Sequence, residues 1–303
     1  MSQVGKRALG VAGGLLLDRM LGEPPAAVHP VAWFGRVMTR CEAVVWEDRR
    51  APGVGYAVGG VALGAAAGVL TRSTMLAVGV CVAGRELRRV AAQVESHLLA
   101  GDLELAREVL PSLVGRDPSS LDASGMSAAV IESLAENSVD AVTGTLVWAL
   151  LLGAPGAAAY RAVNTMDAMV GHRGPRYGRF GWAAARLDDL AGYLPARVFA
   201  GLVVLVRPRA AYRIAVLVLR DSGAHPSPNA GVAETAVAAA LGRELGGPLR
   251  YGQIDQERPR LGDGPRPEAR DIARAIRLTD HVELATGLVL VAIWLCSAER
   301  RAR

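Results

Sequence analysis

Two stretches of the 303-residue sequence decide the fold: APGVGYAVGGVALGAAAGVLT at residues 51–71 and AVTGTLVWALLLGAPGAAAY at residues 141–160. They contain no Asp, Glu, Lys, Arg or His over 21 and 20 consecutive positions, respectively. An α-helix needs about 20 apolar residues to cross the hydrocarbon layer of a membrane, because it rises about 1.5 Å per residue. We therefore expect each stretch to form a membrane-spanning helix.

Three further apolar segments are candidate spans, although each is shorter or carries a charge: residues 73–84, 190–206 and 284–298. Residues 8–17 begin like a signal peptide, but they run into Asp18 without a small-residue cleavage site, so we expect a retained helix. The sequence thus predicts an all-α, polytopic integral membrane protein with about five spans. We expect one membrane-embedded domain over residues 1–303, with polar helical modules at residues 85–140, 161–189 and 220–283.

Glycines recur every four residues along the first stretch, at Gly60, Gly64 and Gly68. Small residues at this spacing share one helix face and let a second helix approach the backbone closely in lipid. We expect a close helix–helix contact there; general richness in Gly and Ala is the alternative explanation.

The composition agrees with a membrane protein and excludes several other classes. Hydrophobic residues make up 51% of the chain and charged residues 21%, with a mean hydropathy of +0.25, which is too apolar for a disordered chain. Lys6 is the only lysine, so neither a P-loop nor a pyridoxal Schiff base can be built. The net charge of +5 comes from arginine, and no basic run interleaved with aromatic residues predicts nucleic-acid binding. Three scattered cysteines favour neither a disulfide framework nor a zinc site.

Carboxylates gather immediately before the second uncharged stretch. Glu132, Glu136 and Asp140 are four residues apart, with Asn137 beside them, so a regular helix would place the three acids on one face. Stacked carboxylates repel one another unless a cation neutralises them, which favours a magnesium site. A solvated helix end is the alternative.

Another polar group follows the second stretch. Arg161, Asn164 and Asp167 are three residues apart and share a helix face close to lipid. Polar side chains this near the hydrocarbon need partners, and they commonly mark functional sites.

The same module continues with two arginines, Arg179 and Arg186, and an acidic pair, Asp188 and Asp189. Arginine forks suit phosphate oxygens and carboxylates suit hydrated magnesium, so this module is suited to a magnesium nucleotide or a phosphorylated substrate. Salt bridges within a helix are the alternative. Adjacent residues project about 100° apart on a helix, so only one aspartate of the pair faces a given ligand.

The segment from His225 to Gly231 is a rigid loop with two prolines ahead of an expected helix. A helix N-terminus after such a loop favours anions, and Asn229 is the candidate binding residue there. His225 is a candidate proton acceptor, although loop histidines also serve as hydrogen-bonding surface residues.

Several ordered motifs together resemble the adenosylcobinamide-phosphate synthase, or cobinamide synthase, family of cobalamin biosynthesis membrane proteins. The resemblance runs over nearly the whole chain and rests on Asp18-Arg19, Gly22-Glu23-Pro24, His29-Pro30, Gly115-Arg116-Asp117, residues 132–140, 160–167 and 180–189, Pro195-Ala196-Arg197 and residues 225–231. The sequence departs from the family pattern at Gly144-Thr145, Gly192 and Val232-Ala233.

The resemblance implies a carbon–nitrogen ligase in the cell membrane. It implies attachment of (R)-1-amino-2-propanol, or its O-phosphate, to the f side-chain carboxylate of adenosylcobyric acid. A carboxylate is a poor acyl donor because its leaving group would be oxide, so activation is required. ATP and Mg²⁺ are therefore implied as cofactors beside the corrinoid and the amine.

On this resemblance we expect the polar modules to converge in one pocket beside the bilayer, with three kinds of side chain. The expected magnesium ligands are Asp140, Asp167 and one of Asp188 and Asp189. The expected substrate- and phosphate-binding residues are Arg161, Arg179, Arg186, Asn137, Asn164 and Asn229. The expected proton acceptor is Glu136 or His225.

Two other functions remain open at this point. A membrane transporter or handling protein for a corrinoid or another anionic small molecule would line its path with Asn and Asp residues, and inverted repeats would support it. The sequence shows no such repeats. A magnesium-dependent prenyl or phosphoalcohol transferase would carry repeated Asp motifs at helical spacing, whereas Asp188 and Asp189 are adjacent.

Overall fold

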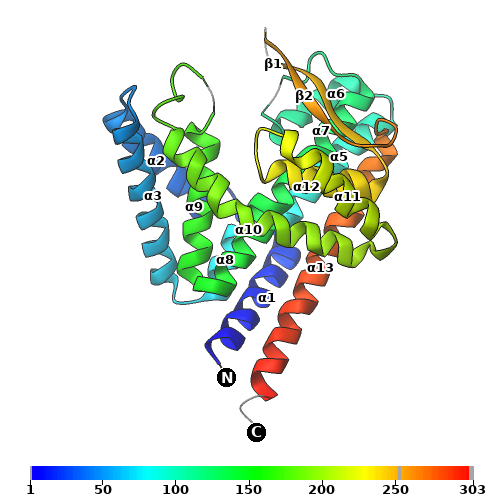
Figure 1. Cartoon of the computed structure of the whole chain (residues 1–303). Helices are drawn as coiled ribbons and strands as arrows, with labels where there is room; N and C mark the ends of the chain where they lie inside the picture. The colour runs from blue at the N-terminus through cyan, green and yellow to red at the C-terminus, as the bar shows by residue number, and fades with distance from the viewer. Residues whose placement is uncertain (1, 116, 173, 252–253, 300–303) are drawn as a thin grey trace. The chain divides into compact units, whose positions relative to one another are not determined.

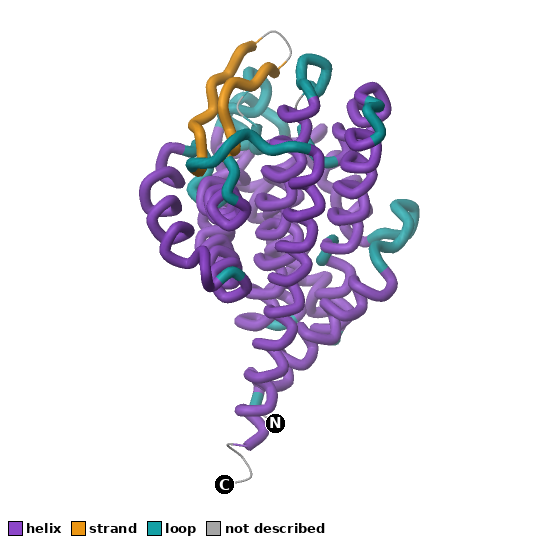
Figure 2. The backbone as a smooth tube through the Cα atoms, turned by 90° about the vertical axis from the view of Figure 1, so that its right-hand side faces the viewer, coloured by secondary structure: helices purple, strands orange, loops and turns teal. Residues whose placement is uncertain are grey.

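The protein is helical almost throughout, as the sequence predicts (Figures 1 and 2). The computed structural model describes residues 2–115, 117–172, 174–251 and 254–299, so Arg116 of the fourth motif lies outside the described residues. The described α-helices are α1 (Gln3–Leu21), α2 (Pro30–Val45), α3 (Arg50–Thr71), α4 (Thr74–Cys81), α5 (Gly84–Leu99), α6 (Leu103–Val109), α7 (Ala123–Ser138), α8 (Gly144–Leu152), α9 (Ala154–Val170), α10 (Trp182–Val206), α11 (Ala211–Asp221), α12 (Ala230–Leu241) and α13 (Ala269–Glu299).

Three of the described helices, α3, α10 and α13, are long and apolar enough to cross a membrane. They contain the predicted spans 51–71, 190–206 and 284–298. The predicted span 73–84 differs, because its helix α4 has only 8 residues. Eight residues rise about 12 Å, well short of the roughly 30 Å of hydrocarbon. The predicted N-terminal helix is present as α1.

The uncharged stretch 141–160 also differs from the prediction, because it is not one helix. A π-helical turn at Val139–Thr143 leads into α8, which ends at Gly153 with a positive φ of 77°. Pro155 then stands in the first turn of α9, where its missing N–H does no harm. Gly153 and Pro155 together reverse the chain, and α8 packs against α9.

The chain divides into two compact units. Unit 1 comprises Met1–Gly84, Asp140–Pro195 and Gly287–Arg303, and unit 2 comprises Arg85–Val139 and Ala196–Thr286. Two of the boundaries between them therefore fall inside the helices α10 and α13.

In unit 1, α3 and α9 lie side by side (Figure 1). A Cβ atom at Gly64 would stand 2.7 Å from the Cβ of Ala162, and one at Gly68 would stand 2.7 Å from the Cα of Pro155. A side chain at Gly60 would collide with Met166. The close helix–helix contact that we expected from the glycine spacing is therefore present, because the glycines let α3 and α9 pack with their backbones close together.

In unit 2, α7 and α12 pack against each other and are buried on nearly all sides. Local caps agree with the sequence: the Asp102 side chain accepts a hydrogen bond from the Leu105 N–H at 3.1 Å and so begins α6. Asp122 caps α7 in the same way.

Unit 2 also holds a feature that the sequence interpretation missed, an antiparallel hairpin of β1 (Glu244–Tyr251) and β2 (Ile254–Gly262). The hairpin lies within residues 220–283, where we expected a polar module made of helices. Two buried carboxylates hold the base of the hairpin. Glu132 accepts the Gly246 N–H at 2.8 Å, and Asp221 accepts the Gly262 N–H at 3.0 Å.

Candidate active site

The candidate site in unit 1 is organised by the first turns of α9 beyond the chain reversal. Tyr160, Arg161 and Asn164 follow one another there, and the Nη1 of Arg161 donates to the Oδ1 of Asn164 at 3.2 Å. This pair confirms that residues three apart share a helix face. The Nε of Arg161 is buried and has no hydrogen-bond partner among the described residues.

Tyr160 lies near two of the predicted acidic residues. Its side chain is buried, and its hydroxyl is within electrostatic range of the carboxylates of Asp140 and Asp188 and of Arg161. The ring packs directly over Gly144, where any Cβ atom would collide with it. The Tyr160 hydroxyl has no hydrogen-bond partner within the described part of the chain. Sequence reasoning gave Tyr160 no role, although it directly precedes Arg161.

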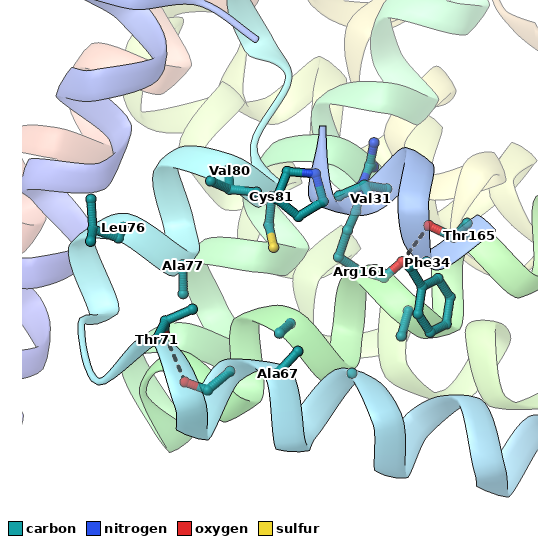
Figure 3. A pocket seen from close by; sticks show the side chains of 15 residues that line it. Val31, Phe34, Ala67, Thr71, Leu76, Ala77, Val80, Cys81, Arg161 and Thr165 are labelled. Atoms are coloured by element: carbon teal, nitrogen blue, oxygen red, sulfur yellow. Dashed lines mark hydrogen bonds between the residues drawn. The ribbon is translucent and has the colours of Figure 1, made fainter. Parts of the chain in front are cut away.

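An apolar cavity of about 350 Å³ lies beside Arg161 within unit 1 (Figure 3). Its lining comes from α2, α3, α4 and α9, and Arg161 is the one charged residue among the described residues that form it. The lining hydroxyls of Thr71 and Thr165 donate to carbonyl oxygens of their own helices, those of Gly68 and Arg161. In Figure 3 the Arg161 side chain extends past Val31 at one edge of the cavity. The arrangement suits a ligand with an anionic group and an apolar part.

His29 lies close to the same guanidinium. Its Nδ1 accepts the Val31 N–H at 3.1 Å and so caps α2, while its Nε2 is 3.5 Å from the Oε2 of Glu23. Burial, and then the positive charge of Arg161, lower the pKa of His29 below its usual value of about 6.5. His29 is therefore neutral near pH 7 and adds no charge to the site. In the sequence analysis His29 entered only as part of a family motif, without a role in the site.

The other predicted residues of unit 1 are more peripheral. Arg179 and Arg186 are largely exposed, and the Nη1 of Arg186 lies 3.4 Å from the Oδ2 of Asp189, within one helical turn. The expected alternative of an intrahelical salt bridge is thus present for this pair. The Asp167 side chain folds back over Gly171, where a Cβ atom would collide with it.

A complete protein-made metal site is not assembled. In the part of the chain that the structure describes, no group of three or more His, Cys, Asp or Glu side chains is arranged to hold a metal ion. Asp140 and Asp188 are both near enough to Tyr160 to influence its hydroxyl electrostatically. Two carboxylates fit Mg²⁺, which keeps several waters and commonly takes one or two carboxylates beside substrate phosphates.

Unit 2 contains the remaining predicted residues. Glu136 is exposed on α7, and the Asn137 amide donates to the Ser133 carbonyl oxygen at 2.9 Å. Glu132 is buried against the hairpin rather than facing a ligand. The predicted stripe of three acids is therefore not formed, because Glu132 is used by β1 and Asp140 lies in a π-helical turn with a different spacing.

His225 is enclosed by protein. Its side chain is 6% exposed, its Nδ1 is 3.0 Å from the Ser227 backbone nitrogen, and its Nε2 is 3.8 Å from the Oε1 of Glu234. Burial lowers the pKa of His225, with smaller contributions from its neighbours. The Oδ1 of Asn229 accepts a hydrogen bond from the Nη1 of Arg197 at 3.1 Å. Both ring nitrogens of His225 thus face groups of unit 2.

The structure therefore brings some predicted residues together and separates others. Unit 1 places four of them near Tyr160: Asp140, Arg161, Asn164 and Asp188. Glu136, Asn137, His225 and Asn229 belong to unit 2.

A family model described as CobD/Cbib protein matches residues 11–279, which cover the candidate site and most of both units. The chain belongs to this family. The relatives of the CobD/CbiB family include the cobalamin biosynthesis protein CobD of Mycobacterium tuberculosis, which is 45% identical over 95% of this chain and 96% of its own length.

Two other members show the same full-length similarity. The cobalamin biosynthesis protein CobD of Chromobacterium violaceum is 41% identical over 92% of this chain and 96% of its own. The cobalamin biosynthesis protein CbiB of Salmonella choleraesuis is 37% identical over 87% of this chain and 90% of its own. No solved structure matches the chain significantly.

Proposed function

We propose that this CobD/CbiB family member is the carbon–nitrogen ligase of cobalamin biosynthesis that converts adenosylcobyric acid to adenosylcobinamide or its phosphate. It would join (R)-1-amino-2-propanol, or the O-phosphate of that amine, to the f side-chain carboxylate. Support comes from the names of its relatives, which are cobalamin biosynthesis proteins. The observation that carries the proposal is the Arg161 guanidinium, which lines an apolar cavity and whose buried Nε has no hydrogen-bond partner among the described residues.

The chemistry requires an anionic acid to become an acyl donor. When bound, ATP would supply the leaving group that the carboxylate lacks, and Mg²⁺ would offset the charge of the ATP phosphates. Asp140 and Asp188 would hold the Mg²⁺, while Arg179 and Arg186 are exposed enough to reach phosphate oxygens.

Arg161 has the role closest to the reacting acid in this proposal. A guanidinium with free donors pairs with a carboxylate or phosphate through two parallel hydrogen bonds, and a low-polarity wall strengthens that pairing. Asn164 fixes the guanidinium from one side and leaves the other donors for the substrate. Arg161 would therefore orient the anion, which is the largest requirement for a reaction between two bound molecules.

The amine must lose a proton to become a nucleophile. Both candidate proton acceptors belong to unit 2: Glu136 is exposed, whereas both ring nitrogens of His225 face protein groups. Substitution tests each candidate: Glu136→Gln or His225→Gln should lower kcat near neutral pH if that residue accepts the proton, and should leave kcat unchanged if it does not.

The experiment that tests the function uses purified full-length protein in lipid nanodiscs with adenosylcobyric acid, Mg²⁺, ATP and either amine. Mass spectrometry of the corrinoid should show the mass of the amide with one of the two amines. An unchanged corrinoid in every combination would contradict the proposal and favour transport. Arg161→Ala should give no product above background, and Arg40→Ala, which changes an exposed arginine of α2 in the same unit, should react normally.

A further inference from the structure

The helix α11 (Ala211–Asp221) of unit 2 is apolar on two opposite faces. Its inner face buries Ile214 and Leu217 in the core of unit 2. Its outer face carries Tyr212, Val216 and Leu219, which are 84%, 41% and 87% exposed. Spacings of four and three residues place these three side chains in one stripe. A helix on a water-exposed surface normally has polar residues on the face opposite the core.

The two arginines of α11, Arg213 and Arg220, each follow a residue of the stripe and so lie along one edge of it. The Nε of Arg213 is 3.0 Å from the Oδ1 of Asp263, and the Nη2 of Arg220 is 2.9 Å from the Oδ2 of Asp221. Both guanidinium groups are therefore beside the apolar stripe and not within it. Long basic side chains in such positions keep their charge in the headgroup layer while their stems cover apolar surface.

The sequence that enters α11 adds to the same pattern. Leu205, at the end of α10, is 57% exposed, and a short 3-10 turn at Pro208–Ala210 connects the two helices. Arg209 in that turn is exposed and makes no ion pair with any residue that the structure describes. The stripe thus follows a helix that is apolar enough to enter a membrane and a cation that makes no ion pair with a described residue.

We propose that α11 lies in the headgroup region of an anionic membrane, with Tyr212, Val216 and Leu219 in the acyl-chain boundary and Arg209 at lipid phosphates. A helix with apolar residues on its outer face and arginines along one edge of that face has the properties of an interfacial helix. A second copy of the chain is the weaker candidate for this surface. A stable protein interface buries about 800 Å² on each partner, and the stripe has only three large side chains.

The experiment measures which solvent surrounds the stripe. The exposed Cys41 and Cys296 are replaced by Ala, and a nitroxide label is attached to Leu219→Cys in full-length protein in vesicles of phosphatidylglycerol and phosphatidylcholine. The matched control is Glu104→Cys on α6 of the same unit, whose side chain is 83% exposed. Collisions with oxygen report hydrocarbon, and collisions with a water-soluble nickel complex report water.

At Leu219 the label should collide with oxygen at least several-fold more than with the nickel complex, and at Glu104 the order should reverse. Tyr212→Cys should behave like Leu219→Cys, which guards against a local effect of one label. Equal collision ratios at Leu219 and Glu104 would overturn the proposal. Protection from both reagents, with spin coupling between copies, would assign the stripe to a dimer instead. In pure phosphatidylcholine the label should lie shallower, and an unchanged depth would remove the role of anionic lipid.

Discussion

The two units differ in how their buried polar groups are paired. In unit 2 several buried acids have specific partners: Glu132 and Asp221 hold the hairpin, Glu283 pairs with Arg88, and Asp271 pairs with Arg274 at 2.6 Å. Some buried atoms of unit 2 also lack a hydrogen bond among the described residues, but their side chains lie within 4.0 Å of an ionisable partner: Arg107, His225, Glu234 and Arg243. In unit 1 the Tyr160 hydroxyl, the Thr145 hydroxyl and the Arg161 Nε are buried without hydrogen-bond partners among the described residues. Buried donors without partners are costly, so the difference indicates stability in unit 2 and ligand binding in unit 1.

The largest effect that tests this difference is the loss of Arg161. Under the proposed function, Arg161→Ala should lower kcat/KM by about 100-fold or more, as expected for a group that binds developing or ground-state anionic charge in a site of low polarity. The thermal midpoint should change little, because among the described residues the guanidinium makes one hydrogen bond, to Asn164. A large fall in the midpoint with nearly normal turnover would instead make Arg161 a structural residue.

The next largest effect is on the Mg²⁺ requirement and concerns the carboxylates of Asp140 and Asp188, which lie near Tyr160. Asp140→Asn and Asp188→Asn should each raise the Mg²⁺ concentration required for half-maximal turnover by about tenfold, since each would remove one charged ligand. Asp263→Asn, whose carboxylate pairs with Arg213 in unit 2, is the control and should leave that concentration unchanged. If all three variants require the same Mg²⁺ concentration, then Asp140 and Asp188 do not bind the metal.

Replacing Glu132 should lower stability and leave turnover nearly unchanged, which is the reverse of the expectation for Arg161. Glu132→Ala leaves the buried Gly246 N–H without its acceptor, which costs about 1–3 kcal/mol of unfolding free energy. The thermal midpoint should fall, whereas turnover of the folded protein at low temperature should stay near that of the wild type. A strong loss of turnover in the folded variant would move Glu132 into the reaction, and the two units would no longer differ.

The packing of unit 1 depends on the contact between α3 and α9. Gly64→Leu should destabilise the protein by about 1–3 kcal/mol, because its Cβ would already stand 2.7 Å from that of Ala162. Gly59→Leu is the matched control on the same helix, because a Cβ there meets nothing within 4 Å. Similar thermal midpoints for the two variants would show that the close approach of α3 and α9 contributes little.

The smallest effect is a pH dependence from His225. Burial lowers its pKa in the folded protein, so below about pH 6.5 the unfolded chain binds a proton that the folded chain does not. Stability from this group is therefore complete above that pH and is lost as the pH falls toward the folded pKa. The thermal midpoint of wild type should decrease more than that of His225→Gln between pH 7 and pH 5.5. Parallel curves would show that His225 keeps its ordinary affinity for protons.

How far the sequence predicts the structure also differs between the units. The spacing of Gly60, Gly64 and Gly68 correctly predicted the close helix pair, since small residues every four positions have few other uses in lipid. The stretch 141–160 was treated as one span because composition was weighed above Gly153 and Pro155, which break the helix. These two residues carried the signal for a reversal.

Unit 2 was less predictable for a physical reason. The strands of the hairpin contain Gly246, Gly247 and several charged residues, so they lack the alternating apolar pattern of an ordinary strand. The hairpin is held by Glu132, more than one hundred residues away, and no local pattern reveals such a partner. Because Glu132 makes this long-range contact, it does not join Glu136 and Asp140 in the acidic stripe that the sequence predicted.

The most direct measurement compares Arg161→Ala with Glu132→Ala in one assay. Both purified variants are held well below their thermal midpoints with corrinoid acid, amine, Mg²⁺ and ATP, and the corrinoid mass is followed by mass spectrometry. We expect Arg161→Ala to remain folded and make no amide, and Glu132→Ala to make it at nearly the normal rate despite a lower midpoint. Amide formation by Arg161→Ala at the wild-type rate would contradict the assignment of the reaction to unit 1.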